Sequence, residues 1–345
     1  MRISKKVVGI VAGAAALALT LAGCSGDSGN GSSDAGSDSG DESIQPIDVN
    51  FGYIADFNGT SLLAVAADQG IWEEHGLNVT TSPFTNGPLQ IQAIGTGDLD
   101  FGYIGPGAMW LPASGKAEII SFNSLGNADR VITQPGIDSI EDLRGKNVAV
   151  PEGTSGDMIL TLALAEAGMT KDDITVVPMD AAGVVTAFAS KQVDAAGIWY
   201  PAIATLKEQV PDLNELAQNS DFSDTMAFPT AFVAGVGIVD KNPEAAKRMV
   251  AALRDAIAWR AANMDEAIDL TATFLALTPE QVAADASNAQ YPTVEELDQW
   301  TSDGTIDTWM ASMTDYFLAA GKLTEADALP ASEFYLGDLF TGEAK

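Results

Sequence analysis

The 345-residue chain holds one cysteine, one histidine and only 17 lysine and arginine residues. A single cysteine excludes an internal disulfide, and so few cysteines and histidines argue against a zinc site. A Ser/His/Asp triad would have to use His75, the sole histidine. With 48 acidic residues the chain has a formal net charge of −31. A charge of this sign and size repels nucleic acid and anionic lipid headgroups. The sequence therefore argues against nucleic-acid binding and most hydrolase or zinc chemistry.

What the chain has is a globular composition, with 46% hydrophobic and 19% charged residues. This composition predicts one large or two medium domains rather than a coiled coil or a disordered chain. Phosphate-loop, His-Glu-x-x-His, Cys-x-x-Cys and EF-hand spacings do not occur in it. We therefore expect neither a cofactor nor a metal ion.

Residues 1–23 have the pattern of a lipoprotein signal peptide. A basic start is followed by an apolar stretch and by Leu21-Ala22-Gly23 directly before Cys24. Residues 24–45 are mostly Ser, Gly and Asp, a composition typical of a flexible tether. We expect lipidation of Cys24 and attachment to the outer face of the cell membrane; the alternative is an uncleaved anchor helix with an unmodified cysteine.

Two blocks of sequence recur at an offset of 94 residues. Gly59-Thr60-Ser61 returns as Gly153-Thr154-Ser155, and segment 93–100 returns in altered form as 187–194. Hydrophobic patterning around both blocks predicts strands alternating with helices, hence parallel sheets with helices on both faces. The expected strands are 49–54, 77–81, 100–104, 147–150, 174–177 and 193–198, and the expected helices are 61–68, 88–94, 155–167 and 183–189.

After residue 239 the pattern becomes helical. Asn242 as N-cap and Pro243 at the first position open a helix over 243–264, and further helices are expected from residues 265, 279, 293 and 306. We interpret the apolar segments 120–133 and 230–239 as two strands that cross between lobes. This interpretation assigns residues 46–131 and 233–345 to lobe 1, and residues 132–232 to lobe 2.

In such lobes a ligand lies beyond the carboxyl ends of the strands, beside helix N-termini. Both Gly-Thr-Ser triplets fall there, where free N–H groups would favour an anionic or strongly polar group. Their alternative role is to cap a helix. The loops hold no lysine or arginine, Arg130 being the nearest in sequence, and they hold acidic residues such as Asp56. A carboxylate there could instead bind an amine of a zwitterionic or cationic ligand.

Several segments between about 49 and 206 carry a resemblance to a known family. They include Ala67-Asp68-Gln69-Gly70-Ile71-Trp72, Gly97-Asp98-Leu99-Asp100-Phe101-Gly102-Tyr103 and Val193-Asp194-Ala195-Ala196-Gly197-Ile198-Trp199, with the segment 140–151 between them. With these segments the chain resembles the solute-binding proteins of the nitrate, sulfonate and taurine ABC importers.

The resemblance implies a type II periplasmic-binding-protein fold, with two α/β lobes joined by two crossing strands. It also implies a non-enzymatic, monomeric receptor that delivers a small solute to an ABC permease with its ATPase. An alkanesulfonate or taurine is the first expectation, and nitrate, a nitrogenous heterocycle or a vitamin precursor are alternatives. The ligand contacts implied by position are Asp56, Phe57, Asn58, Asn86, Gly87, Tyr103, Gly105, Thr154, Ser155 and Trp199.

One departure concerns the end of the last repeated strand, where Trp199-Tyr200-Pro201 stands in place of the family's frequent Trp-Asp-Pro. This change removes the usual polar contact and leaves the ligand class open. Two other classes of function also stay open at this point: a tethered extracytoplasmic enzyme that uses acidic residues, and a module that reports a ligand to a signalling partner.

Overall fold

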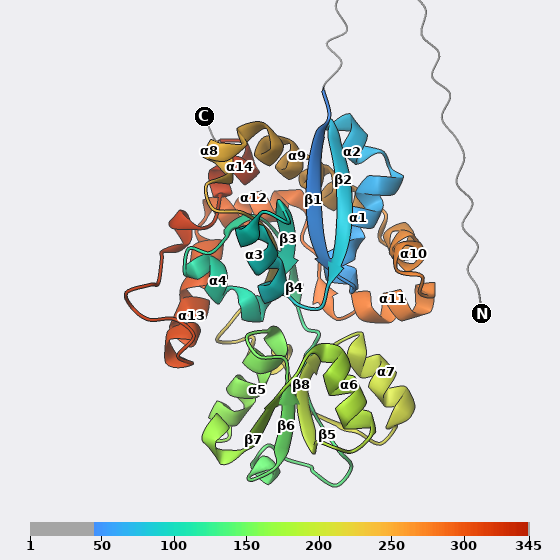
Figure 1. The fold of residues 1–345 in the computed structure, drawn as a ribbon, viewed down its shortest axis with the longest axis vertical. Helices are drawn as coiled ribbons and strands as arrows, with labels where there is room; N and C mark the ends of the chain where they lie inside the picture. Colours follow the sequence, from blue (N-terminus) through green and yellow to red (C-terminus); the bar gives the residue numbers. More distant parts are fainter. Residues whose placement is uncertain (1–44, 344–345) are drawn as a thin grey trace, which may run out of the picture. The chain divides into compact units, whose positions relative to one another are not determined.

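The computed structural model describes residues 45–343, which Figure 1 shows as two β-sheets surrounded by helices. The predicted signal peptide, Cys24 and the tether up to residue 44 lie outside the described residues and stay predictions. Within residues 45–343, no helix combines the length and the apolar character needed to cross a membrane.

The first sheet has six strands in the order β11-β4-β10-β3-β1-β2. β1 pairs in parallel with β2 and β3, whereas β10 runs antiparallel to both β3 and β4. The strand bounds are β1 Ile47–Ile54, β2 Leu77–Phe84, β3 Phe101–Ile104, β4 Glu118–Gly126, β10 Pro229–Ala234 and β11 Ala289–Gln290. We call this sheet and its covering helices lobe 1.

The second sheet has five strands in the order β7-β6-β8-β5-β9. β6 is parallel to β7 and β8, and β5 is antiparallel to β8 and β9. The bounds are β5 Asp129–Thr133, β6 Asn147–Val150, β7 Thr175–Pro178, β8 Ala195–Trp199 and β9 Asn214–Gln218. We call this sheet with its helices lobe 2.

Helices cover both faces of each sheet, as parallel strands require. Lobe 1 contains α1 Phe57–Asp68, α2 Ile71–Glu74, α3 Gly87–Thr96, the 3-10 turn η1 Pro106–Ala108, α4 Trp110–Ala113, α8 Ile238–Lys241, α9 Pro243–Ala262, α10 Met264–Leu275, α11 Pro279–Ala286, α12 Val294–Ser302, α13 Thr305–Ala319, the 3-10 turn η5 Ala331–Glu333 and α14 Gly337–Thr341. Lobe 2 contains the 3-10 turns η2 Glu141–Leu143, η3 Lys171–Asp173 and η4 Asn219–Phe222, and the helices α5 Ser155–Glu166, α6 Ala181–Ala189 and α7 Ala202–Gln209.

The second sheet is buried on both faces because its strands carry apolar residues at successive positions. Val148 and Val150 face one core with α5, while Ala149 between them faces the other core with α6 and α7. In lobe 1, the rings of Phe101 and Phe232 pack on Phe51 with centroid distances of 6.0 and 5.7 Å. These cores fix the strand ends on which the candidate site depends.

Both expected crossings differ from the prediction. The segment 120–133 is divided at residues 127–128, so β4 lies in the first sheet and β5 in the second. The segment 230–239 does not cross: β10 pairs only within the first sheet, and the chain crosses before it, between β9 and β10. β10 is apolar because it is an interior strand with all six residues buried. Residues 129–131 and 229–232 therefore belong to the opposite lobe from the one expected.

The repeated order of elements matches the structure, but the two triplets are not equivalent. α3 and α6, and also β3 and β8, start 94 residues apart, as the repeat predicts. α1 is capped by Asp56, so Gly59 already lies inside its first turn, whereas Thr154 is itself the N-cap of α5. The connection before α5 is longer than the one before α1. The second triplet therefore lies at the N-terminal boundary of its helix rather than inside the first turn.

Candidate ligand-binding site between the two lobes

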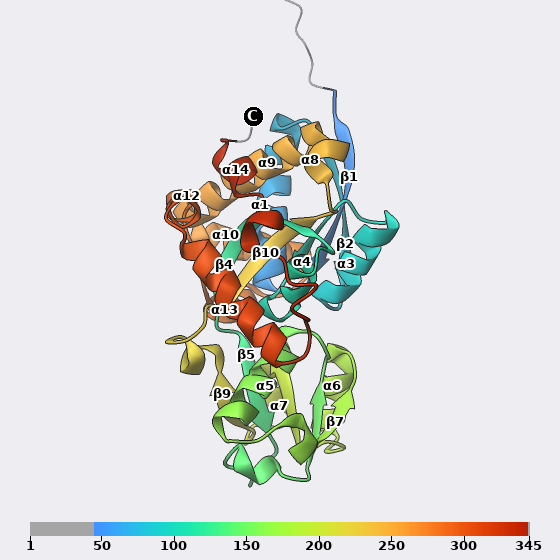
Figure 2. The same ribbon diagram turned by 90° about the vertical axis from the view of Figure 1, so that its left-hand side faces the viewer.

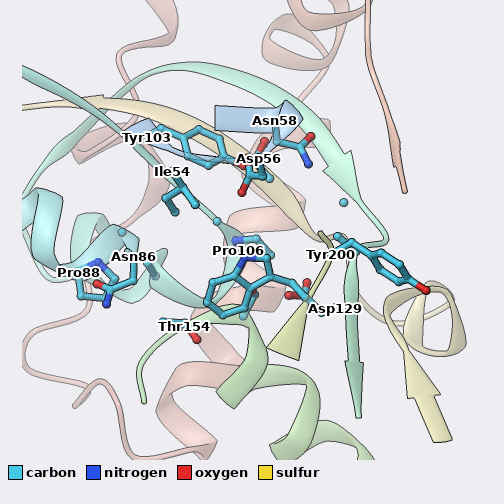
Figure 3. Close-up of a pocket in the computed structure, with 18 residues that line it drawn as sticks. Ile54, Asp56, Asn58, Asn86, Pro88, Tyr103, Pro106, Asp129, Thr154 and Tyr200 are labelled. Carbon is cyan, nitrogen blue, oxygen red and sulfur yellow. The ribbon is translucent and has the colours of Figure 1, made fainter. Parts of the chain in front are cut away.

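A pocket with about 540 Å³ of empty space, its open mouth included, lies between the lobes at the carboxyl ends of their strands. Figure 3 shows Tyr103 and Asp56 on one side of this pocket and Thr154 and Asp129 on the other. The lining residues are Ile54, Asp56, Asn58, Asn86, Gly87, Pro88, Tyr103, Gly105, Pro106, Ala108, Gly126, Ala128, Asp129, Thr154, Ser155, Trp199, Tyr200 and Thr230.

The structure brings nine of the ten expected ligand contacts together in this lining. They are Asp56, Asn58, Asn86, Gly87, Tyr103, Gly105, Thr154, Ser155 and Trp199. Phe57 is the exception, since its side chain is fully buried and packs edge-on against Tyr291 at a centroid distance of 5.2 Å. Phe57 is therefore a core residue, and ligand contact by the other nine stays a prediction.

The N-terminus of α1 is occupied by two carboxyl groups rather than left free for an anion. Asp56 Oδ1 accepts a hydrogen bond of 2.6 Å from the Gly59 amide, and Asp285 Oδ2 accepts one of 2.7 Å from the Phe57 amide. At α3, Asn86 Oδ1 accepts from the Leu89 amide at 3.0 Å. The expectation that both triplets offer free N–H groups to an anion is therefore wrong for lobe 1.

The first triplet has a structural role. Gly59 allows close packing, because a Cβ atom there would lie 2.6 Å from the Ile54 carbonyl oxygen and 2.9 Å from the Tyr103 ring. Thr60 donates to the same carbonyl at 3.0 Å, and Ser61 accepts from the buried Arg260 guanidinium at 2.9 Å. The triplet thus holds α1 against β1 and α9.

Neutral polar groups of lobe 1 form a closed network beside these carboxyl groups. Asn58 Oδ1 accepts from the Ser124 hydroxyl at 2.7 Å, and that hydroxyl also lies 2.7 Å from Thr230 Oγ1. Asn123 donates to the Asn58 carbonyl at 2.8 Å and accepts from Arg260 at the same distance. Asn58 and Thr230 are therefore held in fixed positions at the pocket wall.

In lobe 2 the central feature is Asp129, the first residue of β5. It pairs across the strands with Trp199, the last residue of β8. Two hydrogen bonds to Asn219 hold Asp129 in place. The Asp129 amide donates to Asn219 Oδ1 at 2.8 Å, and Asn219 Nδ2 donates to Asp129 Oδ2 at 2.9 Å. Within the described residues Asp129 Oδ1 is buried and has no hydrogen-bond partner.

The pKa values of the carboxyl groups at this site are all raised. Burial and the neighbouring Asp285 raise the pKa of Asp56 well above its usual range, against a lowering effect of the Gly59 amide. Burial raises the pKa of Asp285 to about 6. Burial also raises the pKa of Asp129, although the nearby Ser155 hydroxyl, the hydrogen bond from Asn219 and the charge of Arg130 oppose it. Each of these carboxylates thus carries a desolvation cost.

Among the described residues, the side chains that line the pocket include no lysine, arginine or histidine. Arg130 is nearby in sequence, but its Nε donates to Glu215 Oε2 at 2.7 Å and its Nη1 donates to the carbonyls of Asn127 and Asp129. Tyr200 points its hydroxyl away from the pocket in Figure 3, and that hydroxyl donates to Glu215 and accepts from Lys207. The charge inside the pocket therefore comes from aspartate.

Sequence reasoning missed several lining residues, of which Asp129, Thr230 and Tyr200 matter most. Asp129 follows the break at residues 127–128 in an otherwise apolar stretch, and that break was the available signal. Thr230 was placed in a crossing strand, and its true position next to β4 depends on sheet pairing that a single sequence does not show. The sequence marks Tyr200 only as a departure from the family pattern.

Asp157, an acidic residue in the first turn of α5, lies outside the pocket lining. It forms ion pairs with Lys171 of lobe 2 and with Lys322 of lobe 1, the latter at 3.1 Å. Among residues 45–343 there is no cluster of three or more His, Cys, Asp and Glu side chains able to hold a metal ion.

With the fold and the pocket established, the chain can be compared with known proteins. A family model described as NMT1/THI5 like matches residues 58–267. The chain belongs to the NMT1/THI5-like family. The match covers the pocket lining from Asn58 onward, but it ends before Asp285.

Two relatives illustrate the range of this NMT1/THI5-like group. One relative is a protein of Brucella abortus (strain 2308) whose name describes it as a binding protein and gives no ligand. The two chains are 53% identical over 297 residues, which cover 86% of this chain and 92% of that protein. This chain is 26% identical over 204 residues to the taurine-binding periplasmic protein of Escherichia coli (strain K12), covering 58% and 62% of the two chains. The resemblance found in the sequence is confirmed.

Solved structures confirm the expected two-lobed fold. The alkanesulfonate-binding protein SsuA from Xanthomonas axonopodis pv. citri bound to MOPS matches with a TM-score of 0.66 at 21% identity, covering 84% of this chain and 98% of that one. The desulfurization enzyme DSZB matches with a TM-score of 0.63 at 16% identity, covering 86% and 98%. The fold of this chain thus occurs in both a binding protein and an enzyme.

Proposed function

We propose that this protein is the extracytoplasmic solute-binding component of an ABC importer. It captures a small organic solute between its two lobes and presents the closed form to a membrane permease. The observation that carries the proposal is the pocket of about 540 Å³ between the two sheets in a chain of this family. Lipidation of Cys24 would keep the receptor at the outer face of the membrane; we expect it to act as a monomer.

The mechanism follows from where the lining residues lie. Asp56 and Asn58 begin α1 in lobe 1, whereas Thr154 and Trp199 end their loop and strand in lobe 2. A solute that contacts both groups binds the closed arrangement more tightly than an open one, so it shifts the population toward closure. The permease would then recognise the closed form.

Two solute classes follow from the relatives, alkanesulfonates and taurine. Of these, taurine fits the lining better, because its ammonium group can donate to the aspartates whereas a plain alkanesulfonate offers only acceptors. Nitrate, a nitrogenous heterocycle and a vitamin precursor are the alternative solutes.

An extracytoplasmic enzyme is the alternative function, and the likeness to the desulfurization enzyme favours it. The sole histidine does not support it, since His75 Nε2 lies 2.6 Å from Asp255 Oδ2 and His75 is not part of the pocket lining. We therefore propose binding rather than turnover.

Thermal unfolding of the purified protein against a panel of compounds tests the proposal. The panel contains taurine, alkanesulfonates, nitrate, amines and heterocycles. A ligand at 100 times its Kd stabilises the folded state by about 2.7 kcal/mol, which raises the Tm by several degrees. Chemical conversion of a stabilising compound, followed by mass spectrometry, would favour the enzyme instead.

A further inference from the structure

Two buried carboxyl groups face the pocket from opposite lobes. Asp56 is 6% exposed and caps α1 in lobe 1, and Asp129 is 3% exposed and begins β5 in lobe 2. Figure 3 shows them on different sides of the space between the lobes. Asp129 Oδ1 has no hydrogen-bond partner within residues 45–343. A buried carboxylate oxygen without a partner is costly, and native proteins keep such groups mainly where a function uses them.

The described part of the chain places no cationic side chain in the lining to neutralise this pair. The buried guanidinium of Arg260, like that of Arg130, lies outside the lining. It donates hydrogen bonds to Ser61 and Asn123. Asp285 adds a third carboxyl group behind Asp56, at the start of α1. A positively charged solute would balance the charge of these groups.

Aromatic side chains surround the same space. Trp199 stands directly opposite Asp129 in the pairing of β8 with β5, and Tyr103 lies in the lining on the lobe 1 side. Aromatic faces attract cations, and carboxylates accept hydrogen bonds from N–H donors. An anionic solute finds neither a charge partner nor a free helix terminus at α1.

We infer that the solute carries a protonated nitrogen, which Asp56 of lobe 1 and Asp129 of lobe 2 hold from opposite sides, with Trp199 and Tyr103 beside it. The inference rests on the proposed receptor function and narrows its ligand to amines, cationic heterocycles or zwitterions such as taurine. The solute's charge then joins the lobes, because each lobe supplies one of the two carboxylates that pair with it.

Two matched sets of probes test the charge. Benzylamine, benzyl alcohol and benzenesulfonate share a ring but differ in charge, and ethanolamine, taurine and ethanesulfonate do the same on a two-carbon chain. Calorimetric titration of the purified protein at pH 7.5 should show, in at least one set, that the amine-bearing members bind ten-fold or more tightly than the plain sulfonate.

Asp129→Asn is the deciding variant, because an asparagine retains an oxygen that can accept from Asn219 while it loses the charge. Its affinity for the amine that binds wild type should fall ten-fold or more. Asp212→Asn is the matched control, since Asp212 is exposed in lobe 2 outside the pocket lining, and it should leave the affinity unchanged.

Other outcomes separate the inference from the function on which it rests. If the plain sulfonates bind best and Asp129→Asn strengthens them, the receptor stands and the cationic solute is wrong. The same conclusion follows if nitrate or a neutral heterocycle raises the Tm while no amine does. If no compound of the broad panel raises the Tm, the receptor function itself is contradicted.

Discussion

At the scale of single residues, two buried carboxyl groups meet at the first turn of α1 and a third faces them from across the pocket. Asp56 and Asp285 accept backbone hydrogen bonds from that turn, and Asp129 raises the pKa of Asp56 from across the pocket. Two tyrosines, Tyr103 and Tyr291, lie near Asp56 and Asp285. Burial raises their pKa values well above the usual range, so they stay neutral. The guanidinium of Arg260 lies 4.7 Å from the Tyr291 ring centroid.

This arrangement predicts that stability rises as the pH falls from about 7 to about 5. Burial raises the pKa of Asp285 to about 6 in the folded state, against about 3.9 when unfolded. Between these values the folded protein binds a proton that the unfolded chain does not, so protonation favours folding. The contribution is complete below about pH 4 and is lost as the pH rises through about 6. Urea unfolding at pH 7 and pH 5 measures it.

Asp285→Asn should weaken this pH dependence and make the protein more stable at pH 7, while Asp56 and Asp129, whose pKa values are also raised, keep part of it. The amide oxygen of asparagine can still accept from the Phe57 amide, so the cap remains. Asp212→Asn, at an exposed position, should keep the wild-type dependence. An Asp285→Asn variant whose stability still rises between pH 7 and pH 5 as steeply as that of wild type would contradict this assignment.

The sequence predicted some of these residues and could not have predicted others. Asp56 and Asn86 could be predicted from the sequence, because an N-cap side chain accepts a hydrogen bond from an amide three residues along the chain, which is a local pattern. Asp285 bonds the amide of a residue 228 positions away, and its role depends on how α11 packs against α1. No pattern in one sequence specifies such a pairing.

At the scale of elements, η1 of lobe 1 packs directly against the N-terminus of α5 in lobe 2. Gly107 makes this contact close, because a Cβ atom there would lie 2.1 Å from the Thr154 carbonyl carbon and 2.2 Å from the Ser155 nitrogen. Both partners are backbone atoms, which cannot rotate away as a side chain does. Glycine at this position thus permits the lobes to close fully over the pocket.

Gly107→Ala should therefore weaken solute binding about ten-fold or more while leaving each lobe folded. The added methyl group must separate η1 from α5, and forced overpacking costs about 1–3 kcal/mol. Titration with the solute that binds wild type gives the affinity, and small-angle X-ray scattering should show a larger radius of gyration in the bound state. Gly95→Ala is the matched control, because no atom lies within 4 Å of a Cβ there.

An unchanged affinity in Gly107→Ala would show that the η1–α5 contact is not part of the binding form. A loss of equal size in Gly95→Ala would show that the effect is not specific to the lobe contact.

The alternation of strands and helices was predictable because each element carries its own periodicity and caps. Each of the ten elements expected in the two repeats is present, with end points that differ by a few residues. The crossing segments were not predictable in the same way, because an interior strand such as β10 and a strand that spans two lobes are both continuously apolar. Only the pairing partners distinguish them.

At the scale of the whole molecule, α13 brings the C-terminal part of lobe 1 down to lobe 2, as Figure 2 shows. The Lys322 ammonium, just beyond this helix, lies 3.1 Å from Asp157 of α5, and the Tyr316 hydroxyl donates to the Met158 carbonyl at 3.5 Å. The same Asp157 also pairs with Lys171 of its own lobe. The two lobes are thus also joined by an ion pair outside the pocket lining.

Lys322→Gln should lower the affinity for the solute about three-fold, since a partly exposed ion pair contributes less than about 1 kcal/mol. Added salt should reduce the difference from wild type because it screens the pair. Lys171→Gln removes the partner within lobe 2, so it should lower stability without a comparable change in affinity. Equal affinities of wild type and Lys322→Gln at low salt would contradict a contribution of this pair to closure.

The hydrogen bond from the Phe57 amide to Asp285 also has a consequence for the order in which the chain is made. Synthesis proceeds from the N-terminus, and the last described residue that lines the pocket is Thr230. A nascent chain that ends between residues 231 and 284 already contains every lining residue but not the second carboxyl group at α1. The hydrogen bond at the start of α1 therefore forms only after α11 has been synthesised, when every described lining residue is already present.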